Sequence, residues 1–583
     1  MRPVTAQLPL FIISFILLTV NPVYCFFKVM PQLIRGVWTE SMSLALIYMS
    51  IALLWAYLIA LIAYVAKKKW VKIILYSLVI LLFGVYCFVQ LNFHSIITPT
   101  IMMAMAETNE GETHEFFSQF AFSWQSIVTY IVVALIVLTS VMMERRHSKI
   151  TAKNGDRRVP VLILLIIIGG VICGAINSSR YYELGKATFL SDLEKSKTFS
   201  RSTFGMDIIS DWLFCLKAMD SSKNEVDRSI KSTITSLKQP ISVKVDSMTI
   251  ILVIGESYIK SHAGIYGYDL NTTPYMQELE QKGQLVAFTN CISPYNTTNI
   301  SLKNALSTNS IGDNEEWYDT PYWPSLLSKA GFTVTMWDNQ YSFSPLAGGG
   351  SLDALLYNKV VSKNTYTGRN EKAFEYDGEL VDDYFRQMAE TGLDNRPKRL
   401  AMFHLMGQHV KPKKRYTKQF DVFKVDNPAY AKWAKYQARY RSEYDNATLY
   451  NDYVINTLAN HYANTCAIMV YFSDHGEEAY DFRNNIGRQN DPVKTKEILH
   501  GQNDVPLVVW HSDSFAKNYP DIVQRIKQAA SRPMMIDLLG YMIMGIAQAD
   551  SPVYRPERDV LSPQYRCPPR ITYNNVDYDK VCK

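Results

Sequence analysis

Three residues that could hold a metal ion follow two apolar segments of strand length. Glu256 comes just after residues 249–254, and Asp474 and His475 come just after residues 467–472. Two carboxylates and one imidazole form a donor set that zinc accepts in its compact tetrahedral sites, and a catalytic zinc keeps a further position for a reactive group. We therefore interpret these three residues as candidate ligands of a catalytic Zn²⁺.

Asp474 and His475 are adjacent, so on an ideal strand their side chains would point to opposite faces. Both can bind one ion only where the chain leaves strand geometry, and the next residue, Gly476, permits such a turn. An isolated Asp-His pair is more often a surface or capping pair. The acid Glu256, which follows another strand in a similar context, favours the metal site.

A run of small polar residues at 296–301 offers hydroxyl groups just before an apparent helix at 301–306. Backbone N–H groups at a helix start favour a phosphate, and a hydroxyl beside a cation loses its proton more readily. The same run is also a common helix cap. The residues alone leave both interpretations open.

From Met248 onward, segments typical of buried strands alternate with segments typical of helices. The strands are predicted at 249–254, 285–290, 332–337, 399–405, 467–472 and 505–510, and the helices at 274–283, 322–330 and 448–461. This alternation predicts an α/β domain with a mostly parallel central sheet covered on both faces. Ligands of such sheets bind beyond the carboxyl ends of the strands, where Glu256, Asp474 and His475 lie.

The first third of the chain carries long uncharged apolar runs, although hydrophobic residues make up an ordinary 48% of the whole. A bilayer core needs about 20 apolar residues as helix. Five such spans are predicted, at residues 8–27, 42–66, 73–93, 124–143 and 159–176. We expect a five-helix transmembrane domain at 1–177, a bridging and interfacial helical linker at 178–245, and an extracytoplasmic catalytic domain at 246–583.

Lys and Arg in the short loops set the orientation of these spans. The loops at 67–72 and 144–158 are basic, and no Lys or Arg occurs between Lys72 and Arg145. The N-terminus is therefore expected in the cytoplasm and everything after residue 177 outside. The formal net charge of +6 is small for 583 residues, so we expect no nucleic-acid partner.

The loop after the third span carries several carboxylates, among them Glu107 and Glu112, between Met and Phe residues. One interpretation is a solvated acidic loop. The other is an interfacial wall of a lipid head-group site, because carboxylates at the membrane surface suit an ammonium group.

The order of the motifs resembles that of the bacterial phosphoethanolamine transferases. The motifs are VIGES at 253–257, YGY at 266–268, TTPY at 272–275, TTNIS at 297–301, GQH at 407–409 and FSDHGEE at 472–478. This family belongs to the alkaline phosphatase and sulfatase-like superfamily and is related to the lipoteichoic acid synthases. The likeness spans nearly the whole chain.

The resemblance implies a role for each matching residue. Glu256, Thr298, Asp474 and His475 would bind the zinc, with Thr298 also the nucleophile, since Ser301 follows it at the family's spacing. His409 and His500 would hold the phosphoryl group or a second metal, with Glu477 nearby. Glu107, Thr108 and Glu112 would contact the lipid head group, where Ala104 departs from the family pattern.

The implied activity is transfer of phosphoethanolamine from phosphatidylethanolamine to a lipopolysaccharide acceptor, lipid A or core, at the periplasmic side of a bacterial inner membrane. The alternatives are a phosphoglycerol transferase of the lipoteichoic acid synthase type and a non-catalytic membrane protein that binds substrate or partners. A sulfatase would need a Cys-x-Pro-x-Arg site, which the segment after Cys291 does not provide. Cys567 and Cys582 are expected to pair in an oxidising compartment.

Overall fold

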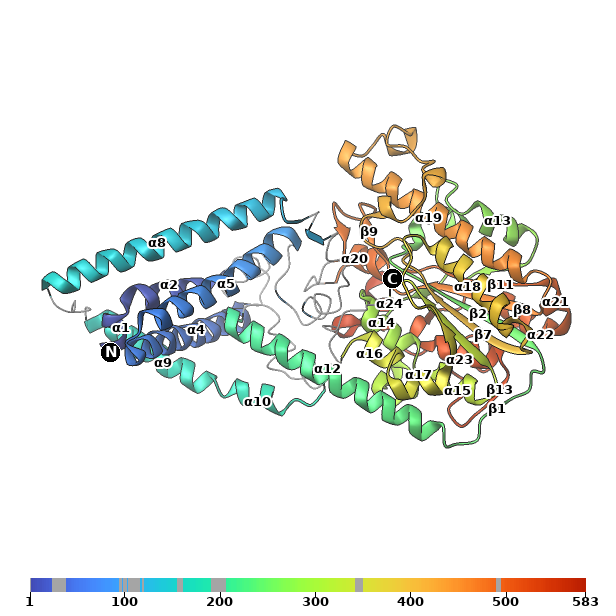
Figure 1. The fold of residues 1–583 in the computed structure, drawn as a ribbon, viewed down its shortest axis with the longest axis horizontal. Helices are drawn as coiled ribbons and strands as arrows, with labels where there is room; N and C mark the ends of the chain where they lie inside the picture. The colour runs from blue at the N-terminus through green and yellow to red at the C-terminus, as the bar shows by residue number, and fades with distance from the viewer. Residues whose placement is uncertain are drawn as a thin grey trace. The chain divides into compact units, whose positions relative to one another are not determined.

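The computed structural model forms two compact units, a helical unit within Met1–Glu225 and an α/β unit from Val226 onward (Figure 1). The structure describes all residues except 1, 22, 24–37, 94–96, 98–101, 103–115, 118–119, 155–160, 190–205, 341–349 and 489–493. Helix α12 (Ile208–Ser236) belongs in part to each unit.

The helical unit is built from apolar helices. They are α1 (Arg2–Ala6), α2 (Leu8–Leu18), α4 (Trp38–Ala66), α5 (Lys69–Phe93), α8 (Trp124–Asn154), α9 (Val161–Asn177) and α10 (Arg180–Lys186). Among the described residues, α4, α5 and α8 are long and apolar enough to cross a membrane. Helix α2 has 11 residues, about 17 Å at 1.5 Å per residue, against a hydrocarbon core of about 30 Å. The predicted first span, and the fifth at the 17-residue α9, therefore stay predictions.

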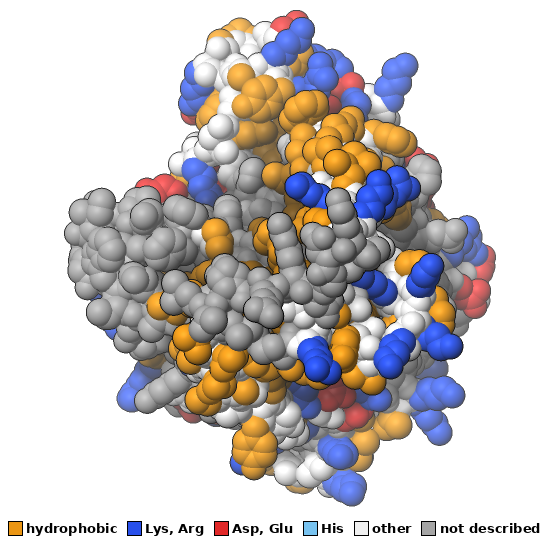
Figure 2. All heavy atoms as spheres, turned by 90° about the vertical axis from the view of Figure 1, so that its left-hand side faces the viewer, with side chains coloured by type: hydrophobic (Ala, Val, Ile, Leu, Met, Phe, Trp, Pro, Cys, Tyr) orange, Lys and Arg blue, Asp and Glu red, His pale blue; other side chains and the backbone are white. Residues whose placement is uncertain are grey.

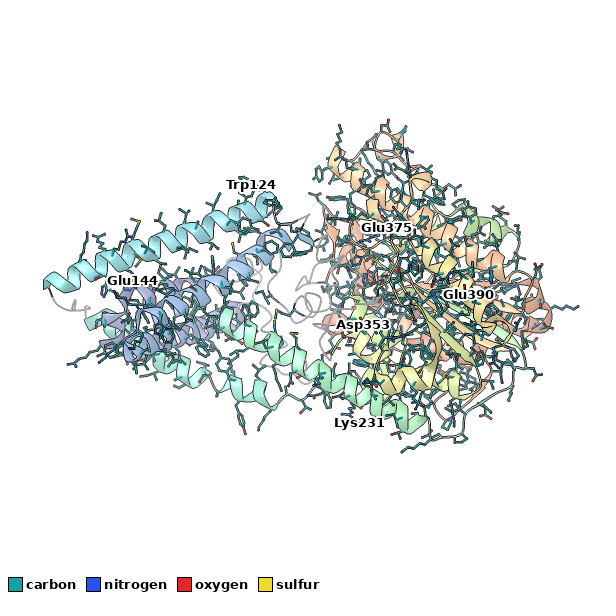
Figure 3. The ribbon with its side chains drawn as sticks, in the orientation of Figure 1. Trp124, Glu144, Lys231, Asp353, Glu375 and Glu390 are labelled. Atoms are coloured by element: carbon teal, nitrogen blue, oxygen red, sulfur yellow. The ribbon has the colours of Figure 1, made fainter. Side chains whose placement is uncertain are left out.

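The helical unit exposes apolar side chains, as a lipid-facing surface requires. Leu135, Leu138 and Met142 on α8 are all more than half exposed. Apolar side chains gather in patches with Lys and Arg around them on the face shown in Figure 2. The carboxylate of Glu144 on α8, labelled in Figure 3, accepts hydrogen bonds from Lys72 Nζ and Tyr76 Oη on α5, both at 2.7 Å. Polar groups of α5 and α8 thus pair with each other.

A seven-stranded mixed sheet forms the centre of the α/β unit. Its order is β3 (Leu285–Ala287), β11 (Leu507–His511), β8 (Ala467–Ser473), β2 (Met248–Gly255), β7 (Lys398–His404), β5 (Thr333–Asp338) and β6 (Tyr366–Arg369). The strands from β8 to β6 are parallel, as predicted, whereas β11 runs antiparallel to both β8 and β3. Antiparallel neighbours need no crossover connection, and strand composition does not reveal the strand direction.

Helices cover both faces of the sheet (Figure 1). The α-helices of this unit after α12 are α13 (Pro274–Gln281), α14 (Thr298–Ala305), α15 (Trp323–Lys329), α16 (Leu352–Leu356), α17 (Lys359–Thr365), α18 (Asp377–Thr391), α19 (Lys435–Tyr462), α20 (Lys496–Asn503), α21 (Asp513–Asn518), α22 (Pro520–Ala529), α23 (Leu539–Ile546) and α24 (Tyr578–Cys582). Ile251 and Val253 of β2 pack in one core with Leu380 of α18 and Val454 of α19. All eight residues of β2 are buried, which explains its unbroken apolar sequence.

The expected disulfide between Cys567 and Cys582 is not formed, and all cysteines that the structure describes are free. The thiol of Cys567 is turned to the carbonyl oxygen of Pro568 at 3.3 Å, while Cys582 ends the short helix α24. The two side chains therefore belong to separate local structures, and that prediction is wrong for this conformation.

A candidate metal and nucleophile site at the sheet edge

The candidate metal ligands lie at the carboxyl ends of two neighbouring parallel strands. Gly255 of β2 pairs in register with Ser473 of β8, so Glu256 and Asp474 leave the sheet side by side. Ligand atoms of Glu256, Asp474 and His475 lie within 4.8 Å of one another, and all three side chains are fully buried. His475 Nε2 is 2.9 Å from Asp474 Oδ2 and 3.3 Å from Glu256 Oε1.

Hydrogen bonds around the Asp-His pair aim both side chains at one point. Asp474 Oδ1 accepts from the backbone N–H groups of Ser257 (3.1 Å) and His475 (2.8 Å). Its Oδ2 is buried and accepts no hydrogen bond from any described residue. His475 Nδ1 lies 3.0 Å from the carbonyl oxygen of Gly476 and so carries the proton, which leaves a lone pair on Nε2.

Gly476 is needed for space. Its φ is not in the left-handed region, but a Cβ there would lie 2.7 Å from the carbonyl oxygen of Gly501 in α20. Gly476 N–H also donates to the carbonyl oxygen of Gln502 at 2.9 Å. The glycine that the sequence suggested as a turn former therefore lets α20 pack against the loop that carries Asp474 and His475.

The charges of the site fit a dication. Burial lowers the pKa of His475 to about 3, and the nearby Arg488 adds to this, so the imidazole is neutral. Burial raises the pKa of the Asp474 carboxyl. A buried carboxylate without a partner is costly unless a cation compensates it. Two carboxylates, a neutral imidazole and the unpaired Asp474 Oδ2 match the donor set of a zinc site.

Thr298 places its hydroxyl at this centre. Its Oγ1 donates to Glu256 Oε2 at 2.9 Å and lies 3.3 Å from His475 Nε2. Helix α14 begins at Thr298, three residues earlier than predicted, with Thr297 as the N-cap. The hydroxyl is thus at the positive end of a helix, where an anion is favoured. Ser301 Oγ points to the carbonyl oxygen of Tyr295 at 3.2 Å.

His409 follows a loop that is bonded to Glu256. The N–H of Gln408 donates to the carbonyl oxygen of Glu256 at 3.0 Å. His409 Nδ1 is buried and has no hydrogen-bond partner among the described residues. Burial lowers the pKa of His409 to about 3, against an opposing effect of the Glu256 charge and with a further lowering by Arg415. The imidazole is neutral and has a nitrogen available for a ligand.

Glu477 and Arg488 form an ion pair beside the centre. Arg488 Nε lies 3.1 Å from Glu477 Oε2, and its Nη1 contacts His475 Nε2. Burial raises the pKa of Glu477 to about 7, although Arg488 opposes the increase. Sequence reasoning missed Arg488, whose only signal is its place in the polar run that begins at Asp474.

The remaining predicted residues are not part of the cluster that the structure describes. His500 Nδ1 lies 2.9 Å from Asp504 Oδ2 and 3.3 Å from Tyr578 Oη. No contact of His500 with Glu256 or Asp474 is found in the described part of the chain, so its role stays a prediction. Glu107, Thr108 and Glu112 lie outside the described residues.

Gln502 was not foreseen, and it joins the loops of two candidate groups. One is the loop at 293–297 before the candidate nucleophile Thr298, which we name the nucleophile loop, and the other is the loop after β8 that carries the candidate metal ligands. Its Oε1 accepts from Asn296 Nδ2 at 2.8 Å, and its Nε2 donates to Glu478 Oε2 at 2.9 Å. Gln340 similarly donates to Glu256 Oε2 at 3.2 Å. Amide side chains between predicted elements have no periodic pattern, so nothing in the sequence singled them out.

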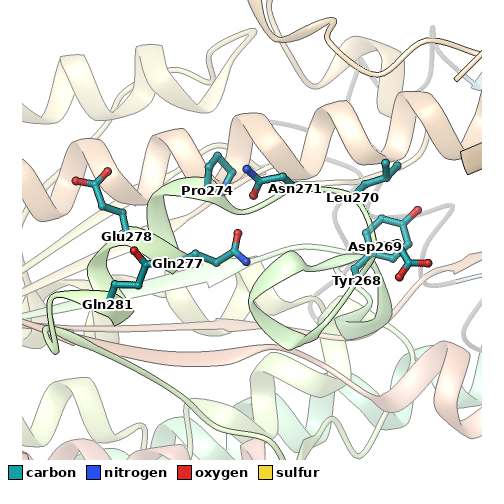
Figure 4. Close-up of a pocket in the computed structure, with 8 residues that line it drawn as sticks. All are labelled: Tyr268, Asp269, Leu270, Asn271, Pro274, Gln277, Glu278 and Gln281. Carbon is teal, nitrogen blue, oxygen red and sulfur yellow. The ribbon is translucent and has the colours of Figure 1, made fainter.

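A shallow polar pocket of ≈ 380 Å³ lies elsewhere on this unit, lined by side chains between Tyr268 and Gln281 (Figure 4). It contains none of the predicted site residues.

Comparison with known proteins identifies the family. The model of the family described as Sulfatase matches residues 248–548, which is more than half of the chain and includes every described residue of the clustered site. The chain belongs to the sulfatase family.

The relatives of this sulfatase-family protein confirm the predicted resemblance. Phosphoethanolamine transferase EptC of Escherichia coli is 25% identical over 510 residues, covering 83% of this chain and 82% of its own. The Kdo(2)-lipid A phosphoethanolamine 7''-transferase of Escherichia coli is 26% identical over 286 residues, covering 47% of this chain and 46% of its own.

Solved structures show the same fold. The zinc complex of the C-terminal periplasmic domain of EptC from Escherichia coli is 25% identical, with a TM-score of 0.50, and covers 59% of this chain and 96% of its own. The integral membrane phosphoethanolamine transferase EptA from Neisseria meningitidis has a TM-score of 0.62 at 18% identity, over 94% of this chain and 97% of its own. The sulfatase-family protein therefore combines a sulfatase-like α/β unit with helices that are long and apolar enough to cross a membrane.

Proposed function

We propose that this protein transfers phosphoethanolamine from phosphatidylethanolamine to a lipopolysaccharide, on lipid A or core, through a covalent intermediate on Thr298. The observation that carries the proposal is the 2.9 Å hydrogen bond from Thr298 Oγ1 to Glu256 Oε2, at the start of α14 and beside Asp474 and His475. A hydroxyl at a helix start, next to a buried acidic cluster with a neutral imidazole, suits attack on phosphorus.

Glu256, Asp474 and His475, together with Thr298, would hold a Zn²⁺ ion. When bound, the ion would stabilise the alkoxide form of the hydroxyl and the charge on the phosphoryl oxygens. The zinc complex of the related EptC domain and the donor atoms described above support this assignment.

Side chains of the protein would position the phosphoryl group in both chemical steps. Thr298 Oγ1 attacks the phosphorus, the bond to the diacylglycerol oxygen breaks, and phosphoethanolamine stays on Thr298. A hydroxyl or phosphate oxygen of the acceptor then attacks the same phosphorus and Thr298 leaves. His409 and the guanidinium of Arg488 would hold the phosphoryl oxygens, and the N-terminus of α14 favours their negative charge.

The donor, acceptor and location are supported by the relatives. Curated relatives are named as transferases of phosphoethanolamine, and one as acting on Kdo(2)-lipid A. The three apolar helices and the periplasmic domain of EptC support a bacterial inner-membrane protein with a periplasmic α/β unit and a cytoplasmic N-terminus. Glu107, Thr108 and Glu112 are proposed to contact the ammonium of the donor, and His500 to contact the phosphoryl group or a second metal.

Mass spectrometry of the full-length protein tests this function. After incubation with phosphatidylethanolamine, we expect an adduct of phosphoethanolamine on Thr298 and release of diacylglycerol. The adduct should be absent from Thr298→Ala and from protein treated with a chelator. A glycerol phosphate adduct would favour the phosphoglycerol transferase instead. Full transfer by Thr298→Ala, or zinc-free protein with unchanged activity, would refute the assignment.

A further inference from the structure

A strongly basic segment follows the loop of His409. Residues 411–439 contain nine cations and two carboxylates, a net charge of +7, whereas the whole chain has +6. The cations are Lys411, Lys413, Lys414, Arg415, Lys418, Lys424, Lys432, Lys435 and Arg439. The small net charge of the whole chain therefore includes one local concentration of positive charge.

The segment is an ordered part of the α/β unit. Phe420, Phe423 and Tyr430 are buried in the core that also holds β2 and α19. Seven of its nine cations are exposed, all except Lys411 and Arg415. Buried aromatic anchors with exposed cations between them make a fixed charged surface, because the backbone that carries the cations is packed.

Much of this charge is not neutralised. Asp421 accepts ion pairs from Lys413 (3.0 Å) and Lys424 (2.9 Å). Lys418, Lys432, Lys435 and Arg439 have no ion pair with any residue that the structure describes. We name these four side chains the basic rim. Their unpaired charges attract an anion more strongly than cations already held in ion pairs.

Both ends of the segment are tied to loops that carry site residues. At its start, Arg415 donates to the carbonyl oxygens of His409 (3.3 Å) and Val410 (2.8 Å). At its end, Gln437 Nε2 donates to Asn484 Oδ1 at 2.7 Å, in the loop that follows Glu477. The Tyr436 ring, 60% exposed, lies 5.9 Å from the Tyr480 ring of the same loop. The segment is thus fixed between the loop of His409 and the loop that follows Glu477.

We propose that the basic rim binds the anionic saccharide of the acceptor, a glycolipid whose sugars carry phosphates. This inference rests on the proposed function and adds how the acceptor is recognised. A phosphatidylethanolamine head group has no net charge, whereas a phosphorylated saccharide carries several negative charges. The unpaired cations of the basic rim therefore select the acceptor over the donor, and the exposed Tyr436 offers a face for a sugar ring.

The test compares two full-length variants in detergent that lose the same charge. The rim variant is K418Q/K432Q/K435Q/R439Q. The control is K329Q/K359Q/K363Q/K527Q, four lysines exposed elsewhere on the same unit. We expect the rim variant to raise the KM for phosphorylated lipopolysaccharide by about tenfold or more at low salt, with less effect at high salt. The control, the KM for dephosphorylated lipopolysaccharide and donor loading of Thr298 should be unchanged.

An unchanged KM for the phosphorylated acceptor in the rim variant would overturn the inference. Loss of binding to phosphatidylglycerol vesicles with an unchanged acceptor KM would also overturn it, since the surface would then contact the membrane. If the wild-type protein forms no adduct on Thr298, the proposed function fails. Direct binding of phosphorylated lipopolysaccharide then decides the inference, and equal affinity of wild type and rim variant would refute it.

Discussion

The guanidinium group of Arg488 lies against Nε2 of His475, the nitrogen that the Gly476 carbonyl leaves free for a metal. Arg488 also donates to the carbonyl oxygen of Asn296 at 3.2 Å, beside the nucleophile loop. A cation in this place repels a dication electrostatically, and the same cation offers hydrogen bonds to a phosphoryl group. Arg488 should therefore affect metal binding and phosphoryl transfer in opposite directions.

Arg488→Gln should bind Zn²⁺ more tightly by about tenfold or more, because one repelling charge is removed from a buried site. The same variant should transfer phosphoethanolamine about 10- to 100-fold more slowly, since a charge-assisted hydrogen bond to the phosphoryl group is lost. Competition with a chelator measures the affinity and lipid mass analysis the rate. The exposed Arg386→Gln is the control. Weaker zinc binding in Arg488→Gln would contradict the inference that the Arg488 guanidinium repels a bound Zn²⁺ ion.

Gly407 permits the His409 loop to lie on Glu256. Its φ is +49°, and a Cβ would lie 2.8 Å from the carbonyl oxygen of Glu256 and 2.9 Å from its nitrogen. Gly392 has a φ of +66° but open space around it, with Asn395 the nearest neighbour at 3.8 Å. A Cβ at either glycine would therefore strain the backbone, and only at Gly407 would it also clash with a candidate metal ligand.

Gly392→Ala should cost about 1 kcal/mol of stability and leave zinc binding unchanged. Gly407→Ala should cost more and should also weaken zinc binding, because the backbone of Glu256 must shift. Denaturant unfolding and zinc titration of both variants measure this difference. Equal zinc affinities would show that Glu256 does not depend on this contact.

Much of the site could be predicted because the local sequence indicates where buried strands end. The apolar runs before Glu256 and Asp474 mark β2 and β8, and parallel neighbours bring their carboxyl ends together. The selection of Thr298 over Thr297 came from the family spacing, and the structure places Thr298 Oγ1 beside Glu256. The residues alone favoured a helix cap at that run.

The remaining features depend on contacts between distant segments. The antiparallel direction of β11 leaves no trace in its apolar sequence. Gln502 contacts Asn296, 206 positions away, and Arg488 is one of many charged loop residues. Such positions gain a function only from neighbours that the fold supplies, so neither periodicity nor composition identifies them.

A substitution of Gln502 tests whether its hydrogen bond to Asn296 holds the nucleophile loop in place. Gln502→Leu keeps the size but removes the hydrogen bonds that the Gln502 amide makes with Asn296 Nδ2, Tyr573 Oη and Glu478 Oε2. We expect a loss of about 2–4 kcal/mol in the free energy of unfolding, because unsatisfied buried polar groups are costly. Loading of Thr298 should slow more than zinc affinity falls.

The exposed Gln281→Leu is the matched control for this substitution, and it should change neither property. The Gln502 side chain has no positioning role if Gln502→Leu unfolds at the same denaturant concentration as the wild type and also loads Thr298 at the wild-type rate.

His262 joins the segment after Glu256 to the segment after Glu477. Its Nδ1 lies 2.5 Å from Asp445 Oδ1, and its Nε2 lies 3.0 Å from both oxygens of Asp481. Arg441 also faces Asp481 at 2.8 Å, and Tyr268 and Tyr430 donate to Asp445. The imidazole is fully buried between two carboxylates.

Burial alone would lower the pKa of His262, but Asp481 and Asp445 outweigh it and raise the pKa to about 9. Because the pKa is higher in the folded than in the unfolded protein, the charged imidazole stabilises fully below about pH 6.5, and this is lost as pH rises through about 9. We expect His262 to contribute a fall of about 3 kcal/mol in the free energy of unfolding across this window, followed at constant zinc saturation. His404 adds a fall of its own, because its pKa, despite burial, is also raised to about 9 by Asp338. His262→Gln should flatten the decline, while the more exposed His461→Gln should retain it. A decline of equal slope in His262→Gln would show that another group titrates.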